Sequence, residues 1–212
     1  MGRPRTTDVQ SLVEAAARVF ERHGYADATL QDVAAEAGVS KPTVYQYVKS
    51  KQRLLEIIVE QVIYPLREGI EQIVEGPDDA RSRIEAYVDL HVRSATRYSA
   101  YYQVLMADQH QLSPEGLRRY QDWARQVNRS LEGLLDEGVA QGVVRPDIDV
   151  KVAANLLNSM LTSIARWYRP LNRLDPGDIR AEVMKLLEGF LVSLDAGESA
   201  HPPKDRSFRP AE

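Results

Sequence analysis

The stretch from Thr29 to Leu55 constrains the fold more than any other part of this sequence. It begins with Thr29 and, three residues later, Asp32, which is the spacing of a capping box at the start of a helix. Gly38 follows, and glycine is the residue that most readily takes the left-handed conformation that ends a helix. The residues between them have the spacing of one buried helical face: Leu30, Val33, Ala34 and Ala37.

A second, shorter helix is predicted over Lys41–Tyr47. Ser40 is a favourable N-cap for it, and Pro42 is tolerated in a first turn, where the N–H group that proline lacks has no helical partner. Val44 and Val48 are expected to be buried. Two helices joined by a tight turn of this kind form a helix-turn-helix, whose second helix presents side chains to base edges in the major groove of DNA.

This motif predicts a set of DNA-binding residues. Base contacts are expected from Lys41, Thr43 and Gln46, and phosphate contacts from Tyr45, Tyr47 and Lys51, the last at the N-terminus of the next helix. The expected surface also includes Thr29, Ser40 and Pro42 at the starts of the two helices. Arg3 and Arg5 flank a proline in an N-terminal arm that either reaches into the minor groove or is a solvated terminus.

The run DVAAEAGVSKPTVYQYVKSKQRLL resembles the DNA-binding motif of the tetracycline-repressor (TetR) family of bacterial regulators. The positions that match the family pattern are Gly38, Val39, Ser40, Thr43, Tyr45, Lys51 and Leu54–Leu55. Pro42 and Val48 depart from it, because a small residue and a phenylalanine are usual there. The resemblance covers Thr7 to about Glu60 and implies a homodimeric repressor that binds a double-stranded, inverted-repeat operator and is released by a small-molecule effector.

Charge and composition limit the class of protein. The chain carries 27 Lys and Arg against 31 Asp and Glu, and this net charge of −4 argues by itself against nucleic acid. Residues 1–53, however, hold eight basic and six acidic side chains, so the positive balance coincides with the motif. The sequence has no apolar run of transmembrane length, no signal peptide and no cysteine, which predicts a cytoplasmic protein without membrane contact.

Periodic apolar patterns predict an all-α fold of about nine helices. We expect a three-helix DNA-binding domain over residues 1–53, a helical effector-binding and dimerisation domain over 54–196, and a disordered tail over 197–212. Gly24 is expected to end the first helix, and Pro65 to kink or break the fourth. Besides the two short helices, the predicted helices are about Thr7–His23, Lys51–Val74, Asp79–Arg97, Ser99–His110, Ser113–Gln141, Asp149–Arg169, and a last one that begins at Pro176 and carries apolar residues to Leu194.

Aromatic residues gather in the middle of the chain and indicate an apolar cavity with a few polar groups, which is the usual composition of a small-molecule site. The alternative is a plain core in which buried tyrosine hydroxyls find partners. The candidate ligand-binding residues are Tyr87, His91, Tyr98, Tyr101, Tyr102, Met106, Trp123, Met160, Arg166 and Trp167.

The segment Arg166–Pro170, followed by Asp175-Pro176, has a second resemblance, to family members that respond to acyl-coenzyme A thioesters, including regulators of fatty-acid and steroid catabolism. An arginine here could pair with a phosphate, and Trp167 could stack on an adenine ring. The alternative is that the arginines complement the helix dipole and the tryptophan packs. An aromatic or drug-like effector competes with the acyl-CoA.

The last two predicted helices have wider apolar arcs than one contact face requires. A pair of such helices from each subunit would form a four-helix interface, as is typical of the family, so a homodimer is expected. The alternative is a monomer with a thick core.

No enzyme is predicted, and no cofactor or metal. The four histidines lack metal-ligand spacing, and neither a glycine-rich phosphate loop nor a G-x-S-x-G stretch occurs. The alternatives are a helical-bundle enzyme with His91 as its base and a helical adaptor for protein partners. Neither of them requires the motif at Ser40–Lys51.

Overall fold

The computed structural model describes residues 9–168, 174–189 and 191, and this part of the chain is helical without a strand. The α-helices are α1 (Val9–Asp27), α2 (Leu30–Ala37), α3 (Lys41–Tyr47), α4 (Lys51–Val74), α5 (Ala80–Arg97), α6 (Ser99–Asp108), α7 (Pro114–Ala140), α8 (Val150–Trp167) and α9 (Pro176–Leu187). The predicted all-α fold is confirmed. Arg3, Arg5, Thr7, Arg169 and the tail from 197 lie outside the described residues.

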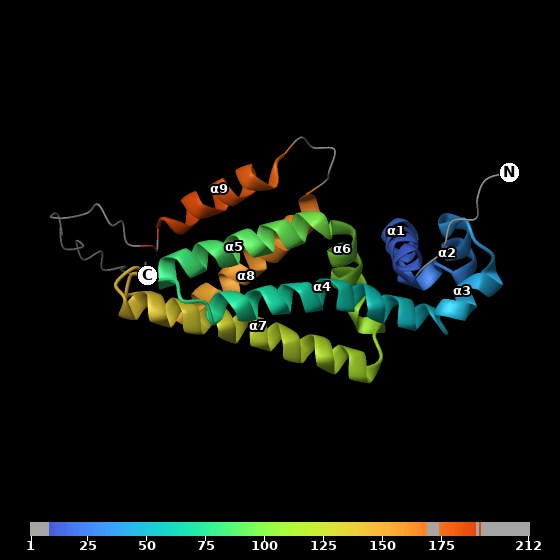
Figure 1. Ribbon diagram of the computed structural model, residues 1–212, viewed down its shortest axis with the longest axis horizontal. Helices are drawn as coiled ribbons and strands as arrows, with labels where there is room; N and C mark the ends of the chain where they lie inside the picture. Colours follow the sequence, from blue (N-terminus) through green and yellow to red (C-terminus); the bar gives the residue numbers. More distant parts are fainter. Residues whose placement is uncertain (1–8, 169–173, 190, 192–212) are drawn as a thin grey trace, which may run out of the picture.

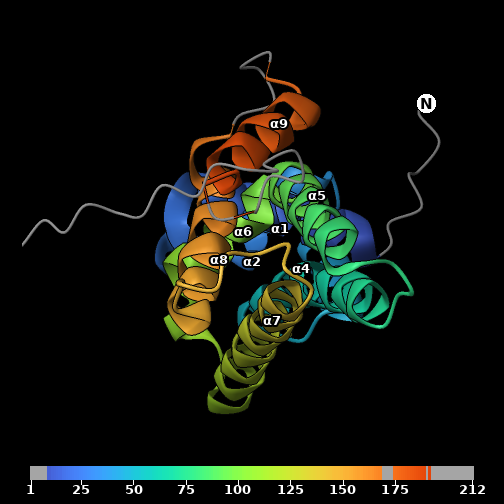
Figure 2. The ribbon, with the colours of Figure 1, turned by 90° about the vertical axis from the view of Figure 1, so that its left-hand side faces the viewer.

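Helices α1, α2 and α3 gather at one end of the molecule, and α4 runs from them into the remaining bundle (Figure 1). In that bundle α4 packs between α5 and α7, α8 packs on α5 and α7, α6 crosses between α1 and α8, and α9 lies on α5 (Figures 1 and 2). The bundle therefore forms one body that touches the N-terminal helices through α4 and α6.

The local signals of the helix-turn-helix are confirmed in detail. Thr29 and Asp32 form a reciprocal capping box, and Gly38 takes a left-handed conformation with φ 70°. The Ser40 hydroxyl accepts a hydrogen bond from the backbone N–H of Thr43 at 3.3 Å, with Pro42 in the first turn of α3. Val44 and Val48 are buried. These short-range interactions fix the angle at which α3 leaves α2.

Gly24 interrupts the first helix at the expected position, and α1 continues for one more turn beyond this kink. Gly24 has φ 74° and breaks the helical geometry, yet helical turns resume and continue to Asp27. The backbone N–H of Ala28 donates to the Gly24 carbonyl at 3.3 Å, and the Tyr25 ring packs edge-on against Phe20 at 5.2 Å. Burial of Tyr25 therefore draws the chain beyond the glycine back against α1.

Helix α4 is continuous over 24 residues and passes through Pro65 without a break. Proline removes one backbone hydrogen bond, to the carbonyl of Gln61, and Pro65 lies on the exposed side of the helix, where water replaces the lost partner. At 1.5 Å per residue the helix is about 36 Å long. It is the longest direct connection between the two ends of the molecule (Figure 1).

Three further helix ends differ from the expectation. Helix α6 stops at Asp108 and a short 3-10 turn covers Gln109–Gln111, α8 stops at Trp167, and α9 stops at Leu187 with Glu188 as its C-cap. The expected ends of α5 and α7 are confirmed within a residue. In the described part of the chain, no helix is long and apolar enough to span a membrane.

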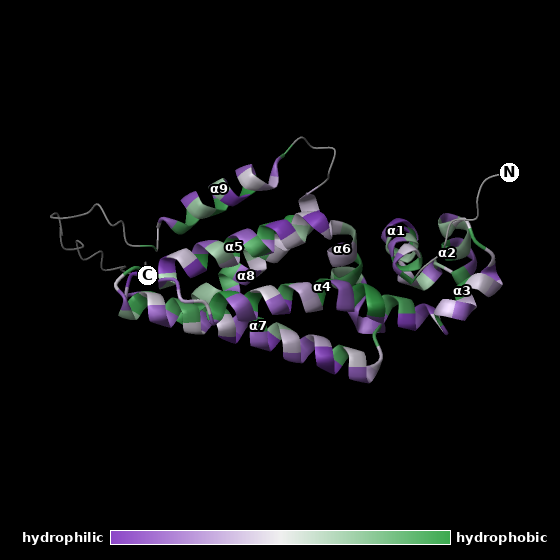
Figure 3. Cartoon of the chain, in the orientation of Figure 1, coloured by the Kyte–Doolittle hydropathy of each residue, from purple (hydrophilic) through white to green (hydrophobic). Residues whose placement is uncertain are grey.

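Hydrophobic and hydrophilic residues alternate along most helices at helical spacing (Figure 3). Helix α7 is the uneven case, because its buried residues lie mainly in its second half: Val127, Leu131, Leu134, Leu135 and Gly138. Its first half, next to α6, is mainly hydrophilic and projects beside α4 (Figure 3).

Candidate DNA-binding surface and effector cavity

The outer face of α3 is unusually aromatic for a solvent-exposed surface. Tyr45 and Tyr47 are 50% and 43% exposed, and Lys41, Pro42 and Gln46 are exposed beside them. The buried Val44 holds the opposite face of this helix in the core. All five exposed residues belong to α3, which lies at the end of the molecule away from the bundle (Figure 1).

Three other expected DNA contacts use their hydroxyls to build the helix starts. The Thr29 hydroxyl lies 2.7 Å from the Asp32 carboxylate, and the Ser40 and Thr43 hydroxyls lie 2.7 Å apart. The hydrogen bond from Thr29 lowers the pKa of Asp32. Thr43 is half-buried. Thr29 and Ser40 thus stabilise the turn.

Lys51 has a different role in the structure from the phosphate contact that was expected. Its ammonium donates to the carbonyl oxygens of Tyr25, Ala26 and Ala28 at 2.6, 3.1 and 2.8 Å. It also lies 4.4 Å from the centre of the Tyr25 ring. An ammonium has three N–H donors, and all three are used in joining the start of α4 to the end of α1. We therefore leave Lys51 out of the proposed phosphate contacts.

Ion pairs join α1 to α2. Glu36 of α2 accepts from Arg18 at 2.7 Å and from Arg22, both on α1. The hydrogen bond from Arg18 is the main cause that lowers the pKa of Glu36. Lys41 and Lys49, at the two ends of α3, are exposed. These two lysines are thus exposed cations within four positions of the exposed tyrosines.

A cavity of about 300 Å³ is bordered by α4, α5, α6, α7 and α8, and it is open to solvent along α8, where Asn155, Ser159 and Arg166 are exposed. Five of the ten predicted ligand-binding residues line it: His91, Tyr102, Met106, Trp123 and Arg166. The other lining residues are Leu66, Leu105, Tyr120, Ala124, Val127, Asn128, Asn155, Asn158, Ser159, Thr162 and Ser163. Its size is at the lower end of the range for small-molecule sites, about 300–1,000 Å³.

The other five predicted residues do not line this cavity. Tyr87 is fully buried and donates its hydroxyl to Asn158 at 2.7 Å, so it supports the wall from behind. Tyr98, between α5 and α6, and Tyr101 of α6 border a different hollow, which residues of α1 also line. Met160 and Trp167 point elsewhere from α8, and Trp167 is 47% exposed.

Sequence reasoning missed a polar stripe on α8. Its members border the cavity and recur at helical spacing: Asn155, Asn158, Ser159, Thr162 and Ser163. The same helix buries Leu157, Leu161 and Ile164 on another face. The sequence carries a signal for this stripe, namely polar residues at helical spacing within an otherwise apolar helix. The prediction for this helix used only its apolar residues.

Burial keeps two ionisable groups of the cavity wall, His91 and Tyr102, neutral. His91 is buried, its Nδ1 lies 3.0 Å from the Tyr87 carbonyl, and its ring stacks on Tyr87 at 4.2 Å. Desolvation lowers the pKa of His91 to about 4 and raises that of Tyr102 to about 12. The imidazole is therefore uncharged at neutral pH. If Nδ1 donates to the carbonyl, Nε2 is left as an acceptor.

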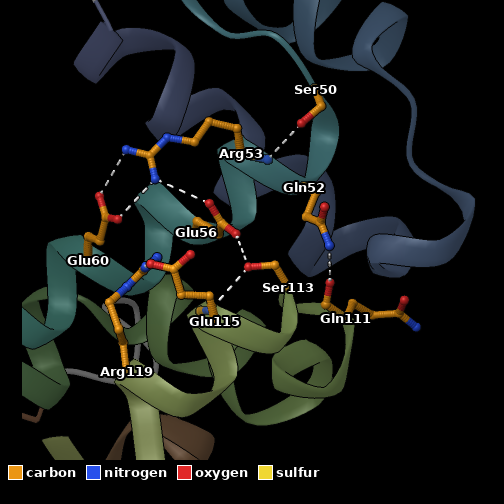
Figure 4. A network of polar contacts seen from close by, with 10 residues as sticks. Ser50, Gln52, Arg53, Glu56, Glu60, Gln111, Ser113, Glu115 and Arg119 are labelled. Carbon is orange, nitrogen blue, oxygen red and sulfur yellow. Dashed lines mark hydrogen bonds and ion pairs between the residues drawn. The ribbon is translucent and has the colours of Figure 1, made fainter.

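A second hollow of about 300 Å³ lies between α4 and α7, and it shares Tyr120 and Trp123 with the first. Beside it a polar network joins the start of α4 to the start of α7 (Figure 4). Glu56 accepts from the Ser113 hydroxyl at 2.7 Å, and Gln52 donates to the Gln111 carbonyl at 3.2 Å. Arg53 bonds Glu60 at 3.0 Å on the same helix. These contacts couple α7 of the bundle to the end of α4 nearest to α3.

Comparison with known protein families gives two matches along the chain. Residues 12–58 match the model for bacterial regulatory proteins of the tetR family. Residues 77–190 match a tetracyclin repressor-like C-terminal domain, which covers more than half of the chain. The first match contains the helix-turn-helix, and the second contains the whole cavity except the α4 wall.

Individual relatives agree with these models. The chain is 26% identical over 160 residues to the HTH-type transcriptional repressor KstR2 of Rhodococcus jostii, covering 75% of this chain and 78% of that protein. The structure of the ketosteroid transcriptional regulator KstR2 of Mycobacterium tuberculosis superposes with a TM-score of 0.82 at 20% identity, over 89% of this chain and 98% of that one. AibR in complex with isovaleryl coenzyme A and operator DNA gives a TM-score of 0.72 at 22% identity, over 84% and 96%. At these identities the two structures establish a shared fold.

Proposed function

Because the chain belongs to the tetR family of bacterial regulatory proteins, we propose that it is a transcriptional repressor that binds operator DNA and is released by a small-molecule effector. It is a regulator and not an enzyme, in keeping with its relatives. The observation that carries the proposal is the exposed aromatic face of α3, held at a fixed angle by the caps at Thr29 and Ser40. Binding to chromosomal DNA would place the protein in the cytoplasm.

We assign DNA binding to residues 1–53 and effector binding and dimerisation to residues 54–196. Helix α3 enters the major groove, with Lys41 and Gln46 toward base edges and Tyr45 and Tyr47 toward phosphates. Thr43 is better placed to buttress the turn than to reach a base, because its hydroxyl bonds Ser40.

A homodimer is proposed from the apolar residues that α8 and α9 leave exposed. Leu156 and Leu186 are 66% and 69% exposed, and Val152 is 53% exposed. These are large apolar side chains on two helices that both pack on α5, and exposed apolar residues of this size are typical of an interface rather than of a solvated surface. Two symmetric copies of this face would set two α3 helices against one operator.

We expect the double variant Leu156→Asp, Leu186→Asp to be monomeric, because two carboxylates would be buried without partners at the interface. Sedimentation at micromolar concentration should give the 23.9 kDa mass of one chain, against twice that for the unaltered protein. Tyr64→Asp, at an exposed aromatic of α4, is the matched control and should stay dimeric. If the double variant is still a dimer, this face is not the dimer interface.

The effector is proposed to bind in the cavity among α4–α8. AibR, which shares the fold, is described with isovaleryl coenzyme A, and an acyl-CoA thioester is accordingly one candidate for this chain. An aromatic or drug-like ligand is the other candidate, favoured by Tyr102, Tyr120 and Trp123 in the wall. Leu66 of α4 lines the cavity, so a ligand there would contact the helix that directly follows α3 in the chain. Release requires that the ligand bind the DNA-free state more tightly.

Selection of tight-binding duplexes from a random DNA pool tests the proposed function. The expected product is an inverted repeat whose half-sites lie about 34–36 Å apart, since each subunit of a dimer fills one major groove. Isovaleryl-CoA and longer acyl-CoA thioesters, added to the complex, test the acyl-CoA candidate separately. A pool that yields no enriched sequence would contradict the DNA-binding assignment.

A further inference from the structure

The residues of α3 that point directly away from the core are set by the one residue that this helix buries, Val44. Positions two before and two after it are Pro42 and Gln46, and both are exposed. At 3.6 residues per turn, each of them lies about 200° around the helix from Val44, which is almost the opposite side. Pro42 and Gln46 therefore form the outer line of α3.

We infer that this outer line reads two A·T base pairs in each half-site of the operator, an inference that rests on the proposed function, in which α3 enters the major groove. The Gln46 amide bonds an adenine, and the Pro42 ring contacts the methyl group of a thymine. A rise of 1.5 Å per residue separates the two side chains by about 6 Å along the helix, which is close to two base-pair steps of about 3.4 Å.

The side-chain amide of Gln46 is available for a base. It is exposed, and it takes part in no hydrogen bond within the part of the chain that the structure describes. The amide has a donor and an acceptor side by side. Adenine is the one base that presents both an acceptor, N7, and a donor, N6, in the major groove, so it matches the amide with two hydrogen bonds.

Pro42 can make only apolar contacts with a base, because it has neither a backbone N–H group nor a polar side chain. It lies in the first turn of α3, next to the Ser40 cap. The apolar feature of the major groove is the C5 methyl group of thymine. A proline on the outer line therefore favours a thymine.

The other residues of α3 leave the floor of the groove to the outer line. Tyr45 and Tyr47 lie about 100° to either side of Gln46 around the helix, toward the two walls of a groove that is about 12 Å wide. Helix α3 contains no arginine, aspartate or glutamate, which are side chains that read guanine or cytosine, and Lys41 at its first position is its one charged residue. Recognition of a G·C pair by α3 thus falls to Lys41, outside the outer line.

Base analogues test each contact without any change to the protein. In one half-site of the selected operator, each adenine in turn is replaced by 7-deazaadenine, which lacks the N7 acceptor, and each thymine by uracil, which lacks the methyl group. Binding of these duplexes is measured with the unaltered full-length protein and with Gln46→Ala and Pro42→Gly. Lys49→Met is the matched control, because Lys49 is an exposed lysine outside α3. Each analogue is compared with the natural duplex for the same protein, so a uniform loss of affinity in a variant cancels.

For the unaltered protein we expect 7-deazaadenine to weaken binding about fivefold at one adenine of the half-site, which is the loss of one hydrogen bond. Uracil should weaken binding about fourfold at one thymine, which is the loss of one buried methyl group. Gln46→Ala should lose the first effect and keep the second, and Pro42→Gly should do the reverse. Lys49→Met should bind every duplex more weakly by the same factor and keep both effects.

The assignment of Gln46 would be overturned if no adenine responds to 7-deazaadenine, or if Gln46→Ala still responds. The assignment of Pro42 would be overturned by the corresponding results with uracil. These outcomes are distinct from a failure of the proposed function. An unaltered protein that binds the selected operator but is insensitive to both analogues refutes only the reading by the outer line, whereas a protein that enriches no operator refutes the proposed function.

Discussion

Replacing Tyr45 and Tyr47 together by alanine is expected to weaken binding to the selected operator about 100-fold and to leave thermal stability unchanged. Both side chains are 43–50% exposed and contribute little to the core, so their loss costs the fold almost nothing. Each tyrosine hydroxyl is proposed to bond a phosphate, and a hydrogen bond of this kind contributes about 0.5–1.5 kcal/mol, so the four contacts of a dimer account for the roughly 2.8 kcal/mol of a 100-fold change. Fluorescence anisotropy with a labelled duplex at one fixed salt concentration measures the effect, because affinities at different ionic strengths cannot be compared.

Tyr64→Ala is the matched control, since Tyr64 is an equally exposed tyrosine, at 56%, on a helix that the proposal does not bring to DNA. Its affinity for the operator should equal that of the unaltered protein. If the double variant binds as tightly as Tyr64→Ala does, α3 is not the recognition helix. A fall in its melting temperature would instead mean that the two rings stabilise the fold.

The features that sequence could predict are those determined by residues close together in the chain. The capping box at Thr29, the left-handed Gly38 and the Ser40 cap each involve residues within four positions of one another. The predicted starts of two further helices, Asp79 and Ser113, are the N-cap residues of α5 and α7 in the structure. Their signals are carried by side-chain chemistry at fixed spacing, so no knowledge of the packed structure was needed.

Long-range contacts account for what was not predicted. Lys51 looked like a phosphate ligand because it opens a helix, but its partners lie 23 to 26 positions earlier in the chain. Tyr98 and Tyr101 looked like part of one aromatic cluster, but the turn between α5 and α6 directs them toward α1. In both cases the residue type suggested a binding role, but the sequence did not predict the direction in which the side chain points.

The arrangement also suggests how an effector signal would reach DNA. The cavity wall includes Leu66 of α4 and Trp123 of α7, and the two helices are tied again at Glu56 and Ser113, nearer to α3. A ligand that shifts α7 against α4 would act on this second contact, which lies one turn from the start of α4 (Figure 4). Lys51 begins that turn and holds it to the end of α1.

Replacing Lys51 by methionine is therefore expected to lower the free energy of unfolding by about 2–3 kcal/mol. Three hydrogen bonds from one ammonium are lost, and bonds to a charged group are worth about 1.5–3 kcal/mol each before allowance for partial exposure. Methionine keeps most of the apolar stem, so the change isolates the charge. Urea unfolding should show a lower midpoint with an unchanged slope.

Lys49→Met provides the contrast, because Lys49 is exposed two positions earlier and makes none of these carbonyl bonds. It should leave stability unchanged and reduce the salt dependence of DNA binding by about one ion per subunit. Lys51→Met, measured at a temperature where it stays folded, should leave that salt dependence as it was. The reverse outcome, a flatter salt dependence with full stability, would mean that Lys51 leaves the carbonyl groups of α1 to bind phosphate when DNA is present. The Lys51 ammonium would then exchange three intramolecular bonds for a DNA contact, and the joint between α1 and α4 would itself change on binding.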